Sequence, residues 1–450
     1  MRLPWRPLKI AALGLGLLVG LGLISWAVTN ARATARVAER IAALRAAGEP
    51  TTLADLRRKP IPPESNAMTY LDQAAPAIKA MVSAVYAVEE QATEEERRAV
   101  GDERPSPAIL AAMRDALAAH PDVVPLLERA AACPGLDRQW DFNLTSQSFL
   151  TSMLTERVSS LRSIWRVLHY QAEVQLADGR RDDALRTCLA MLKLTRLLHH
   201  EPCIVNFLVG MGVRWGNIRV TNRVLTSGPI SPELHAELDA ELARQDLAAA
   251  YRESLRSERA LGSDCFRDLG VPYHLQPLFK NDHCDYLDLI AFAIATADRP
   301  LDDGHVRDEF ARVSREAGFL TRTIVSSIEH ARESRFRNET FLHALRVLNA
   351  IQAREQAGDA SEPQLHKLCL PVEATLDPVN GEPLQIRRTP QGWLIYGVGA
   401  NLMDDGGQLE DDLDVGVGPS AITPKDQTVN NASPSERPTT IAKILYARIH

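Results

Sequence analysis

The stretch from Leu161 to Leu225 constrains the fold most strongly, because its apolar side chains recur at helical spacing and no polar break is long enough for a strand. We predict three consecutive helices here. The middle helix, 181–200, carries apolar side chains over a wide arc of its surface: Ala184, Leu185, Cys188, Leu189, Met191, Leu192, Leu194 and Leu198. An arc of this width predicts neighbouring elements on two sides of the helix.

The first two of these helices are separated by Asp178 and Gly179. Glycine commonly ends a helix in a left-handed conformation that other residues avoid. We therefore expect the helices 161–177 and 181–200 to pack antiparallel as a hairpin.

This hairpin resembles one repeat of the tetratricopeptide family. Ala172, Gly179 and Ala184 stand at the offsets of that family's small residue, turn glycine and second-helix alanine. Met191 replaces a usual alanine, Arg196 stands near the usual proline, and no second copy follows at a fixed period. A peptide-binding repeat and an ordinary helical hairpin both remain open. An open apolar groove along the hairpin would favour the binding role.

The third helix begins near Cys203 and contains the interior glycines Gly210, Gly212 and Gly216. Each costs roughly 1 kcal/mol relative to alanine, so we expect a tight helix contact or a kink there. The spacing is not GxGxxG, because Trp215 occupies the third position, and no strand precedes it. This excludes a dinucleotide-binding fingerprint.

Composition favours a mainly α fold. The 450 residues are 45% hydrophobic, 24% charged and only 5% aromatic, and alanine, leucine, arginine and glutamate are strong helix formers. The net charge is -7, and residues 401–418 carry six acids and no base. Nothing indicates a nucleic-acid surface, which needs clustered lysine and arginine. The six cysteines form no CxxC pair, so a zinc ribbon is not expected.

Residues 10–28 contain no charge and are long enough as a helix to cross about 30 Å of hydrocarbon. We predict a transmembrane anchor, with residues 1–9 in the cytoplasm and the bulk of the chain in the periplasm, so that the lipid bilayer is a partner. The alternative is a signal peptide cut after Ala33, where Ala31 and Ala33 form an A-x-A site.

Residues 31–357 are predicted to form a helical domain. Within it, Val37 to Gly48 is expected to be a separate short amphipathic helix. The other expected segments are one helix from Pro232 to just before Gly270, an irregular connection 272–285, a helix 286–297 and a long helix 319–356.

Residues 358–418 are predicted to form a small β-hairpin module, followed by a flexible tail, 419–450. Two short strand-like runs, 384–388 and 393–398, flank a turn. The tail is rich in proline, serine, threonine and asparagine, a composition typical of disorder.

An acidic loop follows the hairpin, and its candidate carboxylates are Asp404, Asp405, Asp411 and Asp412. Calcium takes six to eight oxygen ligands, and nearby glycines allow the backbone to turn its carbonyls inward. The spacing does not fit an EF-hand. A calcium site and a solvated turn are the two interpretations.

The hairpin and acidic loop resemble the C-terminal end of the major pseudopilins of type II secretion, a resemblance that implies bound calcium. It fails at the other end of the chain, because residues 10–28 contain no acid and no short leader precedes them. The chain from Phe341 onward also resembles a family of membrane-anchored helical proteins of planctomycete-type bacteria. That resemblance implies membrane attachment and no particular activity.

Catalytic motifs are scarce. His199, His200 and Glu201 do not form HExxH, and no GxSxG elbow or P-loop occurs. One further group of metal-binding side chains lies between residues 264 and 285: Asp264, Cys265, His274, Asp282, His283 and Cys284. Their spacing matches no zinc pattern. We therefore predict a membrane-anchored envelope protein that binds or scaffolds other envelope proteins, with a hydrolase site around 264–285 as the alternative.

Overall fold

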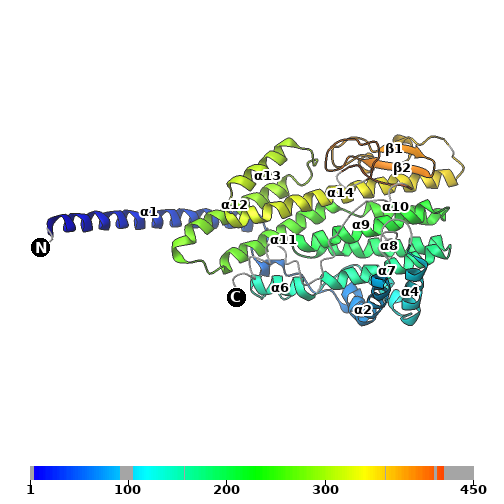
Figure 1. Cartoon of the computed structure of the whole chain (residues 1–450), viewed down its shortest axis with the longest axis horizontal. Helices are drawn as coiled ribbons and strands as arrows, with labels where there is room; N and C mark the ends of the chain where they lie inside the picture. Colours follow the sequence, from blue (N-terminus) through cyan, green and yellow to red (C-terminus); the bar gives the residue numbers. More distant parts are fainter. Residues whose placement is uncertain (1–4, 92–104, 157, 360, 410–412, 420–450) are drawn as a thin grey trace.

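The computed structural model describes residues 5–91, 105–156, 158–359, 361–409 and 413–419. As predicted, the protein is mainly helical, with an apolar N-terminal helix and a small antiparallel sheet near the C-terminus. The helices pack into an elongated body from which the N-terminal helix α1 projects (Figure 1).

Helix α1 spans Trp5–Ala46 and is longer than expected. We predicted a break between the apolar run 10–28 and a second helix at Val37, but the helix is continuous. Residues 29–36 are mostly alanine and arginine, which favour helix. Gly48, with φ +73°, follows the end of the helix.

Three helices, α2 (Ala67–Gln91), α4 (Pro107–Ala119) and α5 (Val123–Ala132), pack against one another or against α7 at one edge of the body. Ser106 caps α4 by accepting a hydrogen bond from the Ile109 amide. The short helix α6 (Ser146–Glu156) precedes the central helices.

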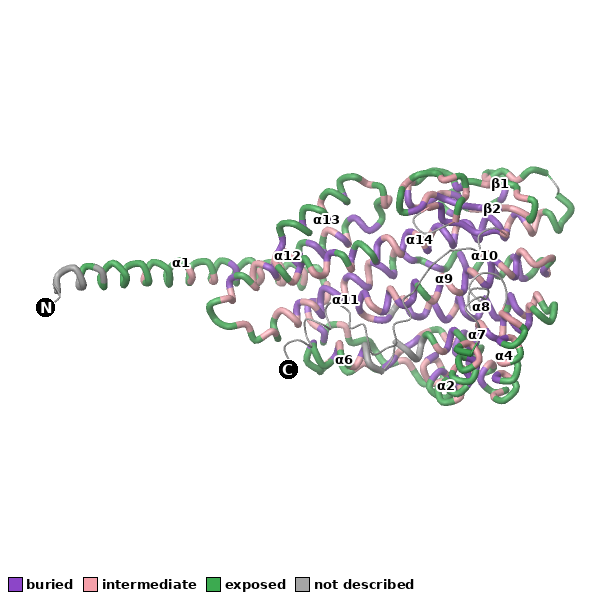
Figure 2. The backbone as a smooth tube through the Cα atoms, viewed as in Figure 1, coloured by how far each residue is buried: buried purple, intermediate pink, exposed green. Residues whose placement is uncertain are grey.

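The three central helices are confirmed as α7 (Val158–Ala177), α8 (Arg181–Leu197) and α9 (Ile204–Thr226). Gly179, with φ +75°, makes the turn between α7 and α8. Helix α8 packs against α5, α7, α9 and α10, so most of its surface is buried, as Figure 2 shows. The hairpin is therefore enclosed and offers no open groove along α8.

The glycines of α9 do not have the expected explanation. A Cβ placed at Gly210, Gly212 or Gly216 would meet nothing within 4 Å beyond the helix itself. No close helix contact therefore requires glycine at these positions, and nothing else in the structure explains them.

The predicted single helix from Pro232 to Gly270 is wrong, because α10 (Pro232–Ala243) and α11 (Leu247–Asp268) are separate. Asp246 begins α11 by accepting a hydrogen bond from the Ala249 amide. The predicted irregular connection 272–285 is also wrong, since α12 spans Gln276–Ala295. Pro277 lies in its first turn, where proline needs no amide hydrogen.

Helix α13 (Gly304–Glu316) is followed by α14 (Phe319–Gln356), whose predicted bounds are confirmed. Short 3-10 turns lie between the helices, and two more lie between α14 and the C-terminal sheet: η1 (Leu53–Leu56), η2 (Pro63–Ser65), η3 (Leu198–His200) and η4 (Tyr273–Leu275), then η5 (Leu365–Lys367) and η6 (Val372–Thr375).

The C-terminal sheet has the order β1 (Gln385–Thr389), β2 (Gly392–Gly397), β3 (Val415–Val417), and all pairs are antiparallel. The predicted hairpin is confirmed, but β3 was not foreseen. Strands β2 and β3 pack on α14, and their buried side chains join the same apolar core as the helices. Buried Asp377 ties the module to α14 by accepting from the Thr340 hydroxyl at 3.0 Å.

Candidate functional site

A cleft of about 590 Å³ lies at the C-terminal end of α1. Its walls come from the chain around η1, the loop 136–142, the turn at Glu201 and α11. The lining side chains are rich in charge and include two aromatics: Arg45, Glu49, Asp55, Arg57, Arg58, Asp137, Arg138, Trp140, Phe142, Glu201, Glu253 and Arg256. A volume of this size suits a ligand rather than a few waters. We call this cavity the charged cleft.

The α11 wall of the charged cleft is fixed by ion pairs. Glu49 bonds both Arg256 (3.2 Å) and buried Arg259 (2.6 Å). Glu253 bonds Arg58 at 2.9 Å. These contacts fasten the chain on either side of η1 to α11, and they neutralise both carboxylates within the wall.

The inner wall holds a buried ion pair. Arg138 Nε lies 3.2 Å from Glu201 Oε2, and the Trp140 indole donates to the same oxygen at 3.0 Å. Burial raises the pKa of Glu201, and the neighbouring Arg138 charge opposes that rise. Both side chains are held by several contacts, so the wall keeps one shape.

Behind this wall, the chain enters α9 through a strained residue. Cys203 has φ +74° and ψ 149°, a region that is essentially restricted to glycine and costs about 1–3 kcal/mol for other residues. Its amide donates to Ser257 Oγ at 3.0 Å, and the next amide, of Ile204, donates to Glu258 at 3.1 Å. Strain of this kind clusters at functional sites. Here the unusual backbone conformation of Cys203 lets the chain pass between the cleft wall and α11.

The remaining acids of the charged cleft are also satisfied locally. Asp55 closes a capping box with Thr52, and these hydrogen bonds, against the opposing effect of burial, lower its pKa. Asp137 accepts from the amide of Gln139 at 2.8 Å.

Two arginines of the charged cleft have neutral partners. Within the described residues, Arg45 donates to the Thr51 hydroxyl at 3.2 Å and Arg57 donates to Asn143 Oδ1 at 2.7 Å. Neither guanidinium therefore has a carboxylate partner in the part of the chain that the structure describes. Glu49, Glu201 and Glu253 pair with arginines, whereas Asp55 and Asp137 accept hydrogen bonds from neutral donors. Together with the aromatic surface of Trp140, the arrangement suits an anionic ligand that carries an apolar group.

The predicted calcium ligands are only partly covered by the structure. Asp404 accepts from the Gly406 amide at 2.9 Å, and Asp405 accepts from the Asn401 side chain at 2.7 Å. Asp411 and Asp412 lie outside the described residues. Among the residues described, no three acidic, histidine or cysteine side chains form a group that could hold a metal. The calcium site stays a prediction.

Asp414, which was not among the predicted ligands, organises the acidic loop. Its buried carboxylate accepts from the amides of Asp405 (3.0 Å) and Gly407 (2.7 Å). The backbone of the loop therefore satisfies this carboxylate directly.

The side chains of the alternative hydrolase site have separate structural contacts. Asp282 accepts from the Leu320 and Thr321 amides and so caps α14. The His283 ring stacks on Phe266, and the Asp264 carboxylate accepts from the Leu53 amide at 2.6 Å. Among the residues that the structure describes, they form no group that could hold a metal ion.

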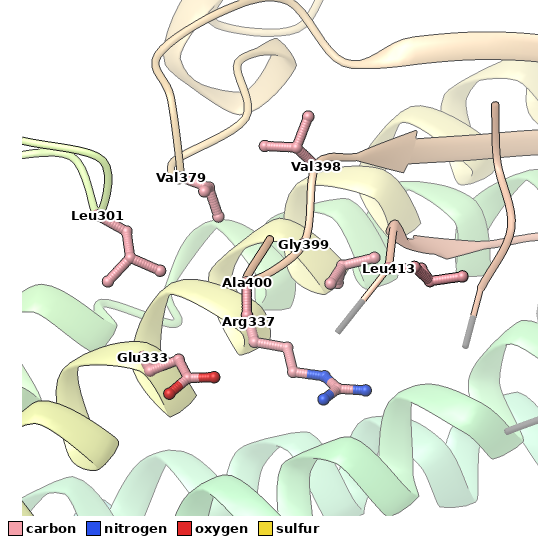
Figure 3. Close-up of a pocket in the computed structure, with 9 residues that line it drawn as sticks. Leu301, Glu333, Arg337, Val379, Val398, Gly399, Ala400 and Leu413 are labelled. Atoms are coloured by element: carbon pink, nitrogen blue, oxygen red, sulfur yellow. The ribbon is translucent and has the colours of Figure 1, made fainter. Parts of the chain in front are cut away.

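A second cavity lies beneath the C-terminal module (Figure 3). It is lined by Leu301, by Glu333 and Arg337 of α14, and by the chain around Val398. Its volume of about 20 Å³ admits little more than a water molecule. It is not a ligand site.

Comparison of the chain with protein-family models, curated proteins and solved structures found no match. The tetratricopeptide, pseudopilin and planctomycete-type resemblances therefore stay predictions, and function is argued from geometry alone.

Sequence reasoning did not find the charged cleft. One signal was available in the basic run Arg57, Arg58, Lys59. The pair Arg138 and Glu201 left no signal in the sequence, because the two residues are distant along the chain and become partners only on folding.

Proposed function

We propose that the protein is anchored in a bacterial envelope membrane by α1 and acts by binding an acidic segment of another envelope protein in the charged cleft. The observation that carries this proposal is that two of the cleft's arginines, Arg45 and Arg57, have no carboxylate partner among the described residues, in a lining that holds five arginines and five acids. Arg45 and Arg57 bond only neutral oxygens in the described structure, while the acids of the cleft are occupied.

The composition of α1 supports the membrane part of the proposal. By length and apolar composition α1 can cross a membrane, and its apolar window is not buried against the body. A signal sequence passes the same test, so the anchor is part of the proposal. The proposed orientation puts Arg2, Arg6 and Lys9 on the cytoplasmic side and the body in the periplasm. The positive-inside rule supports it only weakly, because Arg32, Arg36 and Arg40 follow the apolar run on the other side.

The chemistry of the charged cleft supports a protein partner. Arginine and tryptophan are enriched at protein interfaces and dominate their binding energy. The cleft presents both, on walls that are already held by ion pairs. A preformed site loses less conformational entropy when it binds.

The proposal is tested with synthetic peptides of equal length, one alternating glutamate with phenylalanine and the other alternating lysine with phenylalanine. Binding to the full chain in detergent is measured by fluorescence anisotropy. We expect the acidic peptide to bind about tenfold more tightly or better, with an affinity that falls as salt is added.

The variant Arg45→Gln with Arg57→Gln should remove this preference. Arg312→Gln is the matched control, because Arg312 is an arginine on α13 that pairs with Glu309 and Glu316. Equal affinity for the two peptides, or an acidic preference that survives the double variant, would refute the cleft as the binding site.

A further inference from the structure

The end of the body from which α1 projects carries exposed apolar side chains. Tyr273 is 67% exposed, Leu278 is 65% exposed, and Phe319 at the start of α14 is 60% exposed. The capping bonds from Asp282 hold the start of α14 against α12. Figures 1 and 2 show this end of α12 beside α1, where the projecting helix is exposed on all sides. We call these three side chains the apolar tip.

The apolar tip touches α1 at the end of its apolar run. The rings of Trp26 and Tyr273 lie 4.1 Å apart, and the Trp26 indole donates to the His274 carbonyl at 3.1 Å. Trp26 is two residues from the end of the uncharged run 10–28. The place where the apolar run ends is therefore also the place where the body begins.

Beyond Trp26, α1 is fastened along α12. The Lys280 ammonium donates to both Asn30 and Thr34 at 2.9 Å. Arg40 makes a two-bond contact with Asp288, with both distances 2.7 Å. Contacts spread over three helical turns fix the direction of α1 relative to the body.

The free part of α1 matches a bilayer. Residues 5–25 project beyond the body, and the uncharged part of this projection, residues 10–25, spans about 24 Å at 1.5 Å per residue, most of the hydrocarbon thickness, with Arg6 and Lys9 left at its far surface. If these residues cross the membrane, its surface falls at the level of Trp26. Tyr273 lies at that same level, whereas Phe319 lies beside Asp282, next to the Asn281 that contacts Arg36 farther along α1.

We propose that the apolar tip inserts into the lipid interface beside the anchor, so that the body is held on the bilayer by two contacts. This inference rests on the proposed anchoring by α1. Tyrosine and tryptophan favour the interfacial layer of a membrane. Arg322, in the first turn of α14, suits the lipid headgroups, whereas Lys280 is bonded to α1 and Arg267 pairs with Asp264.

We assign lipid, rather than a protein partner, to the apolar tip because the tip adjoins the part of α1 that would cross the membrane. A tip placed next to an inserted helix and rigidly joined to it enters the interface without any further association step. The second contact would fix the height and orientation of the charged cleft above the membrane.

The test uses the full chain in liposomes of phosphatidylcholine and phosphatidylglycerol. The photoreactive residue benzoylphenylalanine replaces Tyr273 or Phe319, which it resembles in size. Leu17 within the span is the positive control. Val372 and Met403, which are as exposed (68% and 60%) but lie by the C-terminal module, are the negative controls. Lipid adducts are counted by mass spectrometry after irradiation.

We expect lipid adducts at 273 at about ten times the yield seen at 372 and 403, because interfacial aromatic side chains contact lipid. The yield at 319 should be lower than at 273, since Phe319 lies farther along α1 from Trp26. Adducts at 17 but none above the negative controls at 273 and 319 would overturn the tip contact alone. No lipid adduct at 17 would overturn the anchor and the tip together. Protein adducts at 273 in place of lipid would assign the apolar tip to a protein partner.

Discussion

Arg138 Nε lies 3.2 Å from Glu201 Oε2 at the inner wall of the charged cleft, and both side chains are almost fully buried. Each charge lies in a region of low dielectric, where it is tolerated because the other neutralises it. The pair joins the loop 136–142 to the entrance of α9. The shape of the charged cleft therefore depends on it.

Replacing Arg138 by glutamine should destabilise the protein strongly, since Glu201 would remain as a buried charge without its partner. Losses of about 3–5 kcal/mol are typical when one member of a buried pair is removed. Urea unfolding of the detergent-solubilised chain measures the loss. The double variant Arg138→Gln with Glu201→Gln should regain most of it, and a double variant no more stable than the single one would contradict this account.

Glu258 should make stability depend on pH. Burial raises its pKa above the usual 4.5, and the hydrogen bond from the Ile204 amide only partly opposes this rise. The contribution of Glu258 to the free energy of unfolding is therefore fully present below pH 4.5. It is lost as the pH rises through the raised folded-state pKa. Glu258→Gln stays neutral and keeps an acceptor for that amide.

Relative to the wild type, Glu258→Gln should thus gain stability as the pH is raised from 4.5 to 8. Denaturant midpoints measured across this range give the difference. Glu362→Gln, at an exposed acid of the C-terminal module, is the control and should run parallel to the wild type. A difference between Glu258→Gln and the wild type that does not change with pH would disprove the assignment.

The backbone at Cys203 predicts an unusual order of stability among variants. Glycine adopts φ +74° without strain, whereas alanine does not, so Cys203→Gly should be about 1 kcal/mol more stable than Cys203→Ala. Cys188 is also buried but lies within α8. There the order should be the ordinary one, with glycine about 1 kcal/mol less stable than alanine. Thermal unfolding of the four variants measures their order of stability. If alanine were more stable than glycine at both sites, the result would count against strain at Cys203.

The open space at Gly212 predicts a stabilising substitution. Because no atom beyond the helix lies within 4 Å of an added Cβ, Gly212→Ala should raise the free energy of unfolding by about 0.5–1 kcal/mol. The control is Gly262→Ala in α11, where the new Cβ would overlap the Tyr286 hydroxyl. That variant should lose stability. Urea unfolding of both variants measures the two changes. A loss of stability at Gly212→Ala would show that this glycine has a role in α9 that its surroundings do not reveal.

Local patterns in the sequence predicted most of the helical fold. The bounds of α14 match the prediction, and α7, α8 and α9 lie where apolar periodicity placed them. The errors arose where local signals were ambiguous. No glycine or proline marks the break before Asp246, and residues 272–285 were predicted to be irregular although Pro277 lies in the first turn of α12.

The candidate site was much less predictable than the fold. The charged cleft is assembled from α1, the chain around η1, the loop 136–142 and α11, and these segments are far apart in the sequence. The contacts that shape the cleft are ion pairs between residues distant in the sequence. The spacing of apolar residues along the chain does not predict such pairs. The sequence instead drew attention to the acidic loop, where the charges are adjacent in the chain.

The most direct test of the account is reversal of the charge in the charged cleft, since Arg45 and Arg57 are argued to select an anionic segment. Affinities of the glutamate-containing and lysine-containing peptides are measured for the wild type and for the variant Arg45→Glu with Arg57→Glu. Both side chains are exposed and have neutral partners, so folding should be preserved. The account predicts that the preference reverses from the acidic to the basic peptide, and an unchanged preference for the acidic peptide would contradict it.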